Sequence, residues 1–139
     1  MQSILPKEQT LSHIIKNSYQ YYQNPHQGSE TKIVFVCTMG MLRSPTAASV
    51  ASRMGYNARA CGVDPEALIK LSSPLIWWAD IIVFMDQEAC DKALRTTAEH
   101  TKLGVKGLVW NIPDIYKRND PELIAIIEQK LNTLKHGTN

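Results

Sequence analysis

The spacing of apolar and polar positions changes in a regular order along the chain. Continuous apolar runs, or runs with a period of two, predict strands over residues 32–36, 56–61, 80–85 and 105–112. Apolar positions at helical spacing predict helices over residues 44–54, 72–79, 87–97 and 120–134. Because strand and helix alternate, we expect an α/β fold: a three-layer sandwich with a four-stranded parallel sheet and flanking helices.

The first 31 residues precede this alternation. Apolar residues at helical spacing predict an amphipathic helix from Thr10 to Tyr22, with Thr10 as its cap, and a polar linker follows it. We therefore divide the chain into an N-terminal helical extension and linker, 1–31, and a domain, 32–139. The helix is expected to pack on the domain, with a lid or a dimer contact as the alternative, in a monomer or weak homodimer.

Several polar residues mark the ends of the predicted helices. Gly55 follows the helix over residues 44–54 and suits its C-cap. Asp64 and Asp86 follow strands, and we expect them to form a turn and a helix cap. Asp120 stands directly before Pro121, which is the usual order of an N-cap and a first helical residue. These acids are therefore expected to have structural roles.

Composition excludes several classes of protein. The chain has 139 residues, of which 44% are hydrophobic and 20% charged, and this is typical of one globular domain. A formal net charge of +2 does not indicate nucleic acid, and no apolar run has the length of a membrane span. The N-terminus lacks the pattern of a signal peptide. Three cysteines without metal-ligand or disulfide spacing favour a reducing cytoplasm.

The segment after the first predicted strand carries the candidate chemistry. Cys37 ends a buried strand, and ligands of parallel sheets bind at that edge. Gly40 permits the turn, and backbone N–H groups of the turn and of the helix start can converge on an anion. Arg43 adds a planar fork of donors that matches phosphate, and Ser44 can donate to the sulfur. The predicted phosphate-binding residues are Thr38, Met39, Gly40, Met41, Leu42, Arg43 and Ser44.

This arrangement predicts a nucleophilic thiolate, because the positive potential of such a nest favours the anion. The alternative is a buried, inert Cys37 with Arg43 on the surface. That alternative does not explain why the thiol, the turn and the arginine stand together between a strand and a helix. A thiolate that attacks a phosphate ester also needs an acid to protonate the leaving group. Asp114 follows the fourth predicted strand and is the candidate.

The sequence resembles the low-molecular-weight protein tyrosine phosphatases, in particular a short, atypical bacterial branch. "VCTMGMLRSPTA" resembles their signature loop, and "RACGVDP", "WADIIVFM" and "NIPDIY" are similar to later segments of the family. The resemblance implies a phosphatase without a cofactor or metal, in which Cys37 is the nucleophile and Asp114 the general acid. It also implies that Tyr116, together with Met41, walls the slot for an aromatic substrate ring.

Two positions of the loop depart from the family. Gly40 stands where most members have an asparagine that ties the loop to nearby hydroxyl groups, so we expect a softer loop. Leu42 stands where the family often has a second cysteine that protects the nucleophile as a disulfide. We therefore expect Cys37 to be more open to irreversible oxidation.

The sequence favours a cysteine-dependent phosphatase that hydrolyses phosphotyrosine or aryl phosphate monoesters through a cysteinyl-phosphate intermediate. An arsenate reductase would need a relay of further cysteines, and only Cys90 follows the third strand. A cysteine-phosphorylated carrier of a sugar transport system does not need both Arg43 and Asp114. A phosphate-binding module with little turnover remains as the alternative from another class. The expected partners are a phosphotyrosine protein or a small aryl phosphate, with no nucleic acid and no membrane.

Overall fold

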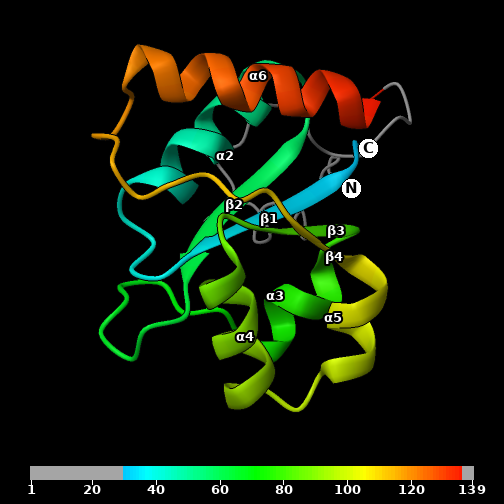
Figure 1. Ribbon diagram of the computed structural model, residues 1–139. Coiled ribbons are helices and arrows are strands. Elements are labelled where there is room, and N and C mark those ends of the chain that lie inside the picture. The colour runs from blue at the N-terminus through cyan, green and yellow to red at the C-terminus, as the bar shows by residue number, and fades with distance from the viewer. Residues whose placement is uncertain (1–29, 136–139) are drawn as a thin grey trace, which may run out of the picture.

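A parallel sheet of four strands, in the order β2-β1-β3-β4, forms the centre of the molecule (Figure 1). The computed structural model describes residues 30–135. Its strands are β1 (Lys32–Cys37), β2 (Asn57–Gly62), β3 (Ile81–Phe84) and β4 (Gly107–Val109). Its helices are α2 (Arg43–Arg53), α3 (Ser73–Trp78), α4 (Gln87–Thr96), α5 (His100–Lys106) and α6 (Pro121–Lys135). The predicted α/β fold with a four-stranded parallel sheet is therefore confirmed.

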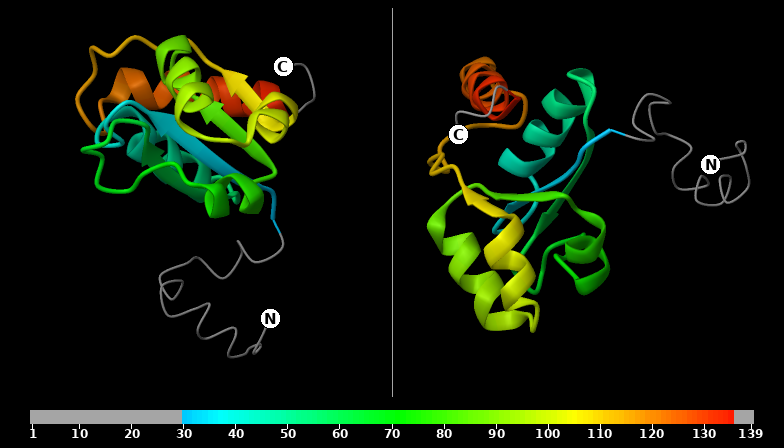
Figure 2. Two further views of the ribbon diagram at one scale, coloured as in Figure 1. Left: turned by 90° about the horizontal axis from the view of Figure 1, so that it is seen from below. Right: turned by 90° about the vertical axis from the view of Figure 1, so that its right-hand side faces the viewer.

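Helices cover both faces of the sheet. The views in Figures 1 and 2 show α2 and α6 on one face, and α3, α4 and α5 on the other. Strand β1 contributes side chains to the core on both faces of the sheet, because successive side chains of a strand point to opposite faces. Phe35 belongs to the core cluster that includes α2 and α6, and Val36 to the cluster that includes the other three helices. This burial on both sides explains why the strand is apolar throughout.

The strand order brings three loops together at one edge of the sheet. Strand β1 lies between β2 and β3, with Cys37 opposite Gly62 and Val36 opposite Phe84. The backbone then continues in register, because Met85 donates to the Val36 carbonyl over 2.8 Å. The segments after β1, β3 and β4 consequently start from neighbouring positions, as seen at the left edge of Figure 1.

The prediction was wrong where it extended the last strand back to Val105. Val105 and Lys106 belong to α5, a helix that the sequence pattern did not reveal, and β4 is only three residues long. Within α5 only Leu103 is buried, so the apolar spacing was too sparse to indicate a helix. The other predicted elements are present, with ends that differ by one or two residues.

Two of the predicted helix ends are confirmed in detail. Gly55 follows α2 with a φ of 98° and donates its N–H to the Ser52 carbonyl. Asp86 caps α4, because its Oδ1 accepts the Ala89 N–H over 2.9 Å. The helix predicted from Thr10 to Tyr22 lies outside the described residues. Within residues 30–135, no helix has the length and apolarity needed to cross a membrane.

Candidate functional site: a thiol, an arginine and two carboxylates

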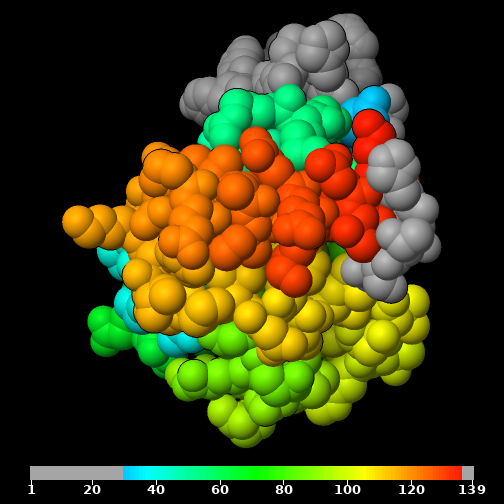
Figure 3. All heavy atoms as spheres, turned by 45° about the horizontal axis from the view of Figure 1, so that its top comes forward, coloured from blue at the N-terminus to red at the C-terminus, as the bar shows by residue number. Residues whose placement is uncertain are grey.

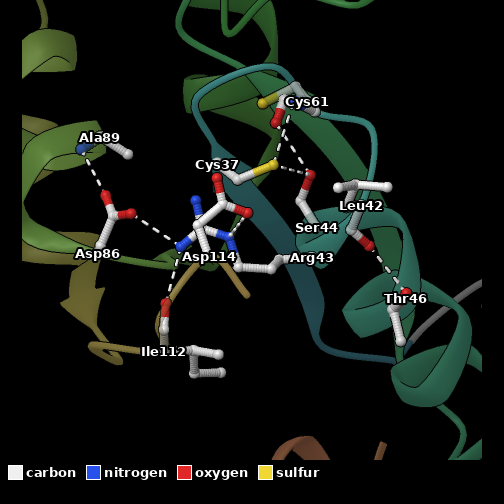
Figure 4. Close-up of polar contacts among 11 residues, drawn as sticks. Cys37, Leu42, Arg43, Ser44, Thr46, Cys61, Asp86, Ala89, Ile112 and Asp114 are labelled. Carbon is white, nitrogen blue, oxygen red and sulfur yellow. Dashed lines mark hydrogen bonds and ion pairs between the residues drawn. The ribbon is translucent and has the colours of Figure 1, made fainter. Parts of the chain in front are cut away.

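Cys37 lies at the base of the loop between β1 and α2. Its Sγ accepts a hydrogen bond from the Gly40 N–H over 3.1 Å and lies 3.0 Å from the Ser44 Oγ (Figure 4). The residue is 3% exposed, so the sulfur is almost fully buried. The contacts are those expected for a nucleophile.

Ser44 has one hydroxyl proton and two acceptors within reach. Its Oγ donates to the Cys61 carbonyl over 3.2 Å, and it also contacts the Cys37 sulfur. With a thiol, the S–H donates to Ser44, and Ser44 donates to the carbonyl. With a thiolate, the Ser44 hydroxyl turns to the sulfur. Ser44 therefore has a suitable partner in both protonation states, as a reacting cysteine requires.

Gly40 has no room for a side chain. Its φ is 75°, and a Cβ at this position would lie 2.8 Å from the Cys61 carbonyl carbon. A Cβ on Gly62 would meet the Met39 carbonyl carbon at 2.6 Å. The Thr38 carbonyl also accepts two N–H groups from the chain after β2. Backbone contacts thus join the loop to the end of β2, and the softer loop expected from the missing asparagine stays a prediction.

Arg43 is buried, contrary to the alternative that placed it on the surface. Its side chain is 3% exposed, and its Nη1 donates to the Asp86 Oδ2 and to the Ile112 carbonyl, each over 2.8 Å. These two bonds use both Nη1 protons. The Nε and Nη2 donors lie on the other edge of the guanidinium, which is the pair that can bind two oxygens of one phosphate, and Nε also faces the Asp114 carboxylate.

Asp86 has a second function that the sequence analysis missed. One of its oxygens caps α4, and the other pairs with Arg43, 43 residues earlier in the chain. The side chain is 28% exposed. The available signal was the position of Asp86 directly after a strand, because the carboxyl ends of parallel strands meet at one edge. Helix capping alone had seemed sufficient to explain this residue.

Asp114 reaches the same guanidinium from the segment after β4. Its Oδ1 lies 3.5 Å from the Arg43 Nε, and its side chain is 63% exposed (Figure 4). The structure thus brings together the predicted nucleophile loop and the predicted acid. Asp120, the other aspartate after β4, instead accepts the Glu122 N–H over 2.8 Å at the start of α6. Its capping role is confirmed.

The segment that carries Asp114 is tied to the loop at a second point. The Asn119 N–H donates to the Thr46 Oγ1 over 2.9 Å, and this hydroxyl donates to the Leu42 carbonyl over 2.8 Å. Thr46 is fully buried on α2. One buried hydroxyl therefore connects the end of the cysteine loop to the far end of the acid segment.

Met41 and Tyr116, the two predicted walls of the slot, have different surroundings. Met41 is 55% exposed at the edge of the loop, where an apolar contact was expected. Tyr116 packs against the core cluster beneath α2 and α6, and its hydroxyl lies 3.5 Å from the Glu122 carboxylate. The role of Tyr116 as a substrate wall stays a prediction.

A second thiol, Cys61, lies close to the loop but on the other side of the sheet. It belongs to the core cluster with Val36, whereas Cys37 belongs to the opposite cluster. Burial, and then the neighbouring Cys37, raise the pKa of Cys61 to about 12. Cys61 is therefore a protonated core residue at neutral pH. Residues 30–135 contain no group of His, Cys, Asp or Glu side chains that could hold a metal ion.

Comparison with known proteins identifies the fold. No protein-family model and no curated protein sequence matches the chain. Among solved structures, the tyrosine phosphatase AmsI of Erwinia amylovora is similar, with a TM-score of 0.61 and 16% identity over 79% of this chain and 95% of its own. A low-molecular-weight phosphotyrosine phosphatase of Vibrio cholerae has a TM-score of 0.56 and 18% identity, over 76% of this chain and 95% of its own.

The YwlE arginine phosphatase of Geobacillus stearothermophilus is similar to the same degree. Its TM-score is 0.57 and its identity 19%, over 78% of this chain and 99% of its own. The chain therefore has the fold of the low-molecular-weight protein tyrosine phosphatases. The family resemblance predicted from the sequence is confirmed at the level of the fold.

Proposed function

We propose that this chain is a cysteine-dependent phosphatase that hydrolyses phosphotyrosine or aryl phosphate monoesters. The observation that carries the proposal is the state of Arg43: it is buried, held by two bonds through Nη1, and adjacent to Asp114. A surface arginine would not be buried in this way with its other donor edge toward the predicted acid. The structural neighbours of this fold include tyrosine and arginine phosphatases.

In the first step, the Cys37 thiolate attacks phosphorus, and the bond from phosphorus to the ester oxygen breaks. The Nε and Nη2 of Arg43, with backbone N–H groups of the loop, stabilise the charge on the phosphoryl oxygens. Asp114, in its protonated form, gives its proton to the leaving oxygen. The products are cysteinyl-phosphate and the free phenol.

In the second step, water attacks the phosphorus of the cysteinyl-phosphate. Asp114, now a carboxylate, takes a proton from this water, and the bond from sulfur to phosphorus breaks. Inorganic phosphate and the Cys37 thiolate result, and Ser44 again donates to the sulfur. The same Arg43 and backbone donors serve both steps.

The test is hydrolysis of p-nitrophenyl phosphate at mildly acidic pH in the presence of a chelator. We expect turnover by the wild type, none by Cys37→Ser, and very little by Arg43→Ala. Asp114→Asn should lose about 10²- to 10⁴-fold in rate, as is usual when a general acid is removed. If Cys37→Ser keeps the rate, the mechanism is wrong; if the wild type binds vanadate without turnover, the chain is a phosphate-binding module.

Phosphoarginine is the substrate with which to compare aryl phosphates, because structural neighbours include arginine phosphatases. We expect the aryl substrate to be preferred, since exposed apolar side chains such as Met41 and Ile115 lie on the loops around the site and suit an aromatic ring. Parallel assays with phosphotyrosine and phosphoarginine decide between the two. A higher kcat/KM for phosphoarginine would overturn the preference but not the cysteine mechanism.

A further inference from the structure

Exposed apolar side chains gather around the candidate site. Nine large hydrophobic side chains are exposed among the described residues, and six of them lie on the loops that follow β1, β2 and β4. The six, which we call the apolar rim, are Met39, Met41, Leu42, Leu68, Ile69 and Ile115. The other three lie on the helices that cover one face of the sheet. The exposure is therefore concentrated at the edge that carries Cys37.

The rim residues come from three loops that contact one another. The Ile69 carbonyl accepts the Gly62 N–H over 2.9 Å, and the backbone of Gly62 lies against that of Gly40. Ile115 directly follows Asp114, which pairs with Arg43. In Figure 3 the three loops, coloured cyan, green and orange, come together at the left edge of the molecule. The rim is thus held in place beside the cysteine loop.

Three residues of the apolar rim are highly exposed for large apolar side chains. Leu68 is 92% exposed, Ile115 is 74% exposed, and Ile69 is 58% exposed. Exposed apolar side chains are common singly, but a group of them around a site is typical of an interaction surface. Under the proposed function the phosphate binds in the loop at Cys37, so the molecule that carries the phosphate lies against the rim.

The charges of the same loops indicate which kind of molecule this is. The loops over residues 38–42, 63–72 and 111–120 contain four acidic and three basic residues. The acidic ones are Asp64, Glu66, Asp114 and Asp120, and the basic ones are Lys70, Lys117 and Arg118. A surface for an anionic membrane would carry a clear positive excess. A nearly neutral, apolar surface instead matches a polypeptide with apolar side chains.

We propose that the apolar rim binds apolar side chains that flank the phosphorylated residue of a protein substrate. The inference rests on the proposed phosphatase function and adds the sequence context of the substrate. The physiological substrate is then a protein segment in an extended or unfolded form, because apolar residues on both sides of a phosphorylated residue are buried in most folded proteins.

The test compares two phosphotyrosine peptides, one with leucine and isoleucine flanks and one with serine and glycine flanks. The double variant Leu68→Ser, Ile69→Ser removes part of the rim and touches neither Cys37 nor Arg43. Val105→Ser is the matched control, because Val105 is 80% exposed on α5, outside the three loops. p-Nitrophenyl phosphate, which is too small to span the rim, reports the chemistry alone.

For the wild type we expect a KM about tenfold lower for the apolar peptide than for the polar one, as burial of one large apolar side chain provides. The double variant should lose most of this difference and keep its rate on p-nitrophenyl phosphate, and Val105→Ser should change neither. Equal KM values for the two peptides in the wild type, or an unchanged difference in the double variant, would overturn the inference.

Two further measurements separate the possible failures. The affinities of both peptides for the Cys37→Ser variant measure binding to the rim without turnover. An inactive wild type would therefore refute the phosphatase function, and the peptide affinities would still test the rim. Sedimentation with phosphatidylcholine and phosphatidylserine vesicles tests whether the rim binds a lipid surface instead of a peptide. Vesicle binding by the wild type that the double variant loses would assign the rim to a lipid surface and overturn the inference.

Discussion

The bond between Asp86 and Arg43 gives the account its most specific prediction. In Asp86→Ser the hydroxyl can still cap α4, because serine is a good N-cap residue, but its short side chain cannot reach the Arg43 Nη1. The substitution therefore removes the carboxylate that holds the guanidinium and keeps the helix start. Asp64→Ser is the matched control: Asp64 also follows a strand and accepts a backbone N–H, from Glu66, over 2.8 Å.

The size of the effect follows from the contact. Hydrogen bonds to charged groups contribute about 1.5–3 kcal/mol. The Asp86 side chain is 28% exposed, and the Ile112 carbonyl still holds Arg43, so we expect about 1–2 kcal/mol. This corresponds to a loss of roughly 5- to 30-fold in kcat/KM.

The assay is steady-state hydrolysis of p-nitrophenyl phosphate, together with the inhibition constant for vanadate. Both kcat/KM and vanadate affinity should fall in Asp86→Ser, because in the proposed mechanism Arg43 binds the anion in the ground state as well as in the transition state. Asp64→Ser should stay within twofold of the wild type. If Asp86→Ser is indistinguishable from this control, Asp86 does not position Arg43, and the reasoning is refuted.

Three other expectations concern the hydroxyl tie and the thiols. Thr46→Val removes the oxygen that accepts the Asn119 N–H and should loosen the segment that carries the proposed acid, Asp114. Phenyl phosphate has a poor leaving group that depends on this acid, so its hydrolysis should slow several-fold more than that of 2,4-dinitrophenyl phosphate. An equal loss for both substrates would refute the role of the Thr46 hydroxyl. Since its pKa is raised to about 12, Cys61 should stay protonated at neutral pH and react with iodoacetamide far more slowly than Cys37, as peptide mass spectrometry can measure. Peroxide should convert Cys37 to sulfinic acid, because Cys61 lies on the other face of the sheet; a disulfide between them would contradict this.

Much of the fold was predictable because its elements differ in period. The continuous apolar run of β1 predicts a buried strand, and the apolar stripe of α6 predicts a helix. Helix α5 was missed for a physical reason: it buries one residue, Leu103, and contains Gly104, so neither spacing nor propensity indicates it. Its position depends on packing against the sheet, which no local pattern records.

The candidate site was predictable where its residues follow one another along the chain. Cys37 ends β1 and Arg43 begins α2, so one short loop joins them and their proximity follows from the strand and helix. The second role of Asp86 depends on the pairing of β1 with β3, and that pairing depends on the strand order. The lack of room at Gly40 depends on the backbone of Cys61, which only the folded sheet brings there.

Formation of the covalent intermediate on Cys37 tests the central claim most directly. The protein is mixed with p-nitrophenyl phosphate, quenched within the first turnovers and digested with trypsin, which releases the peptide from Ile33 to Arg43. We predict that this peptide carries one phosphoryl group on Cys37 in the wild type and that the signal is absent from Cys37→Ser. Turnover without phosphorylation of this peptide, or phosphorylation at another residue, would contradict the account.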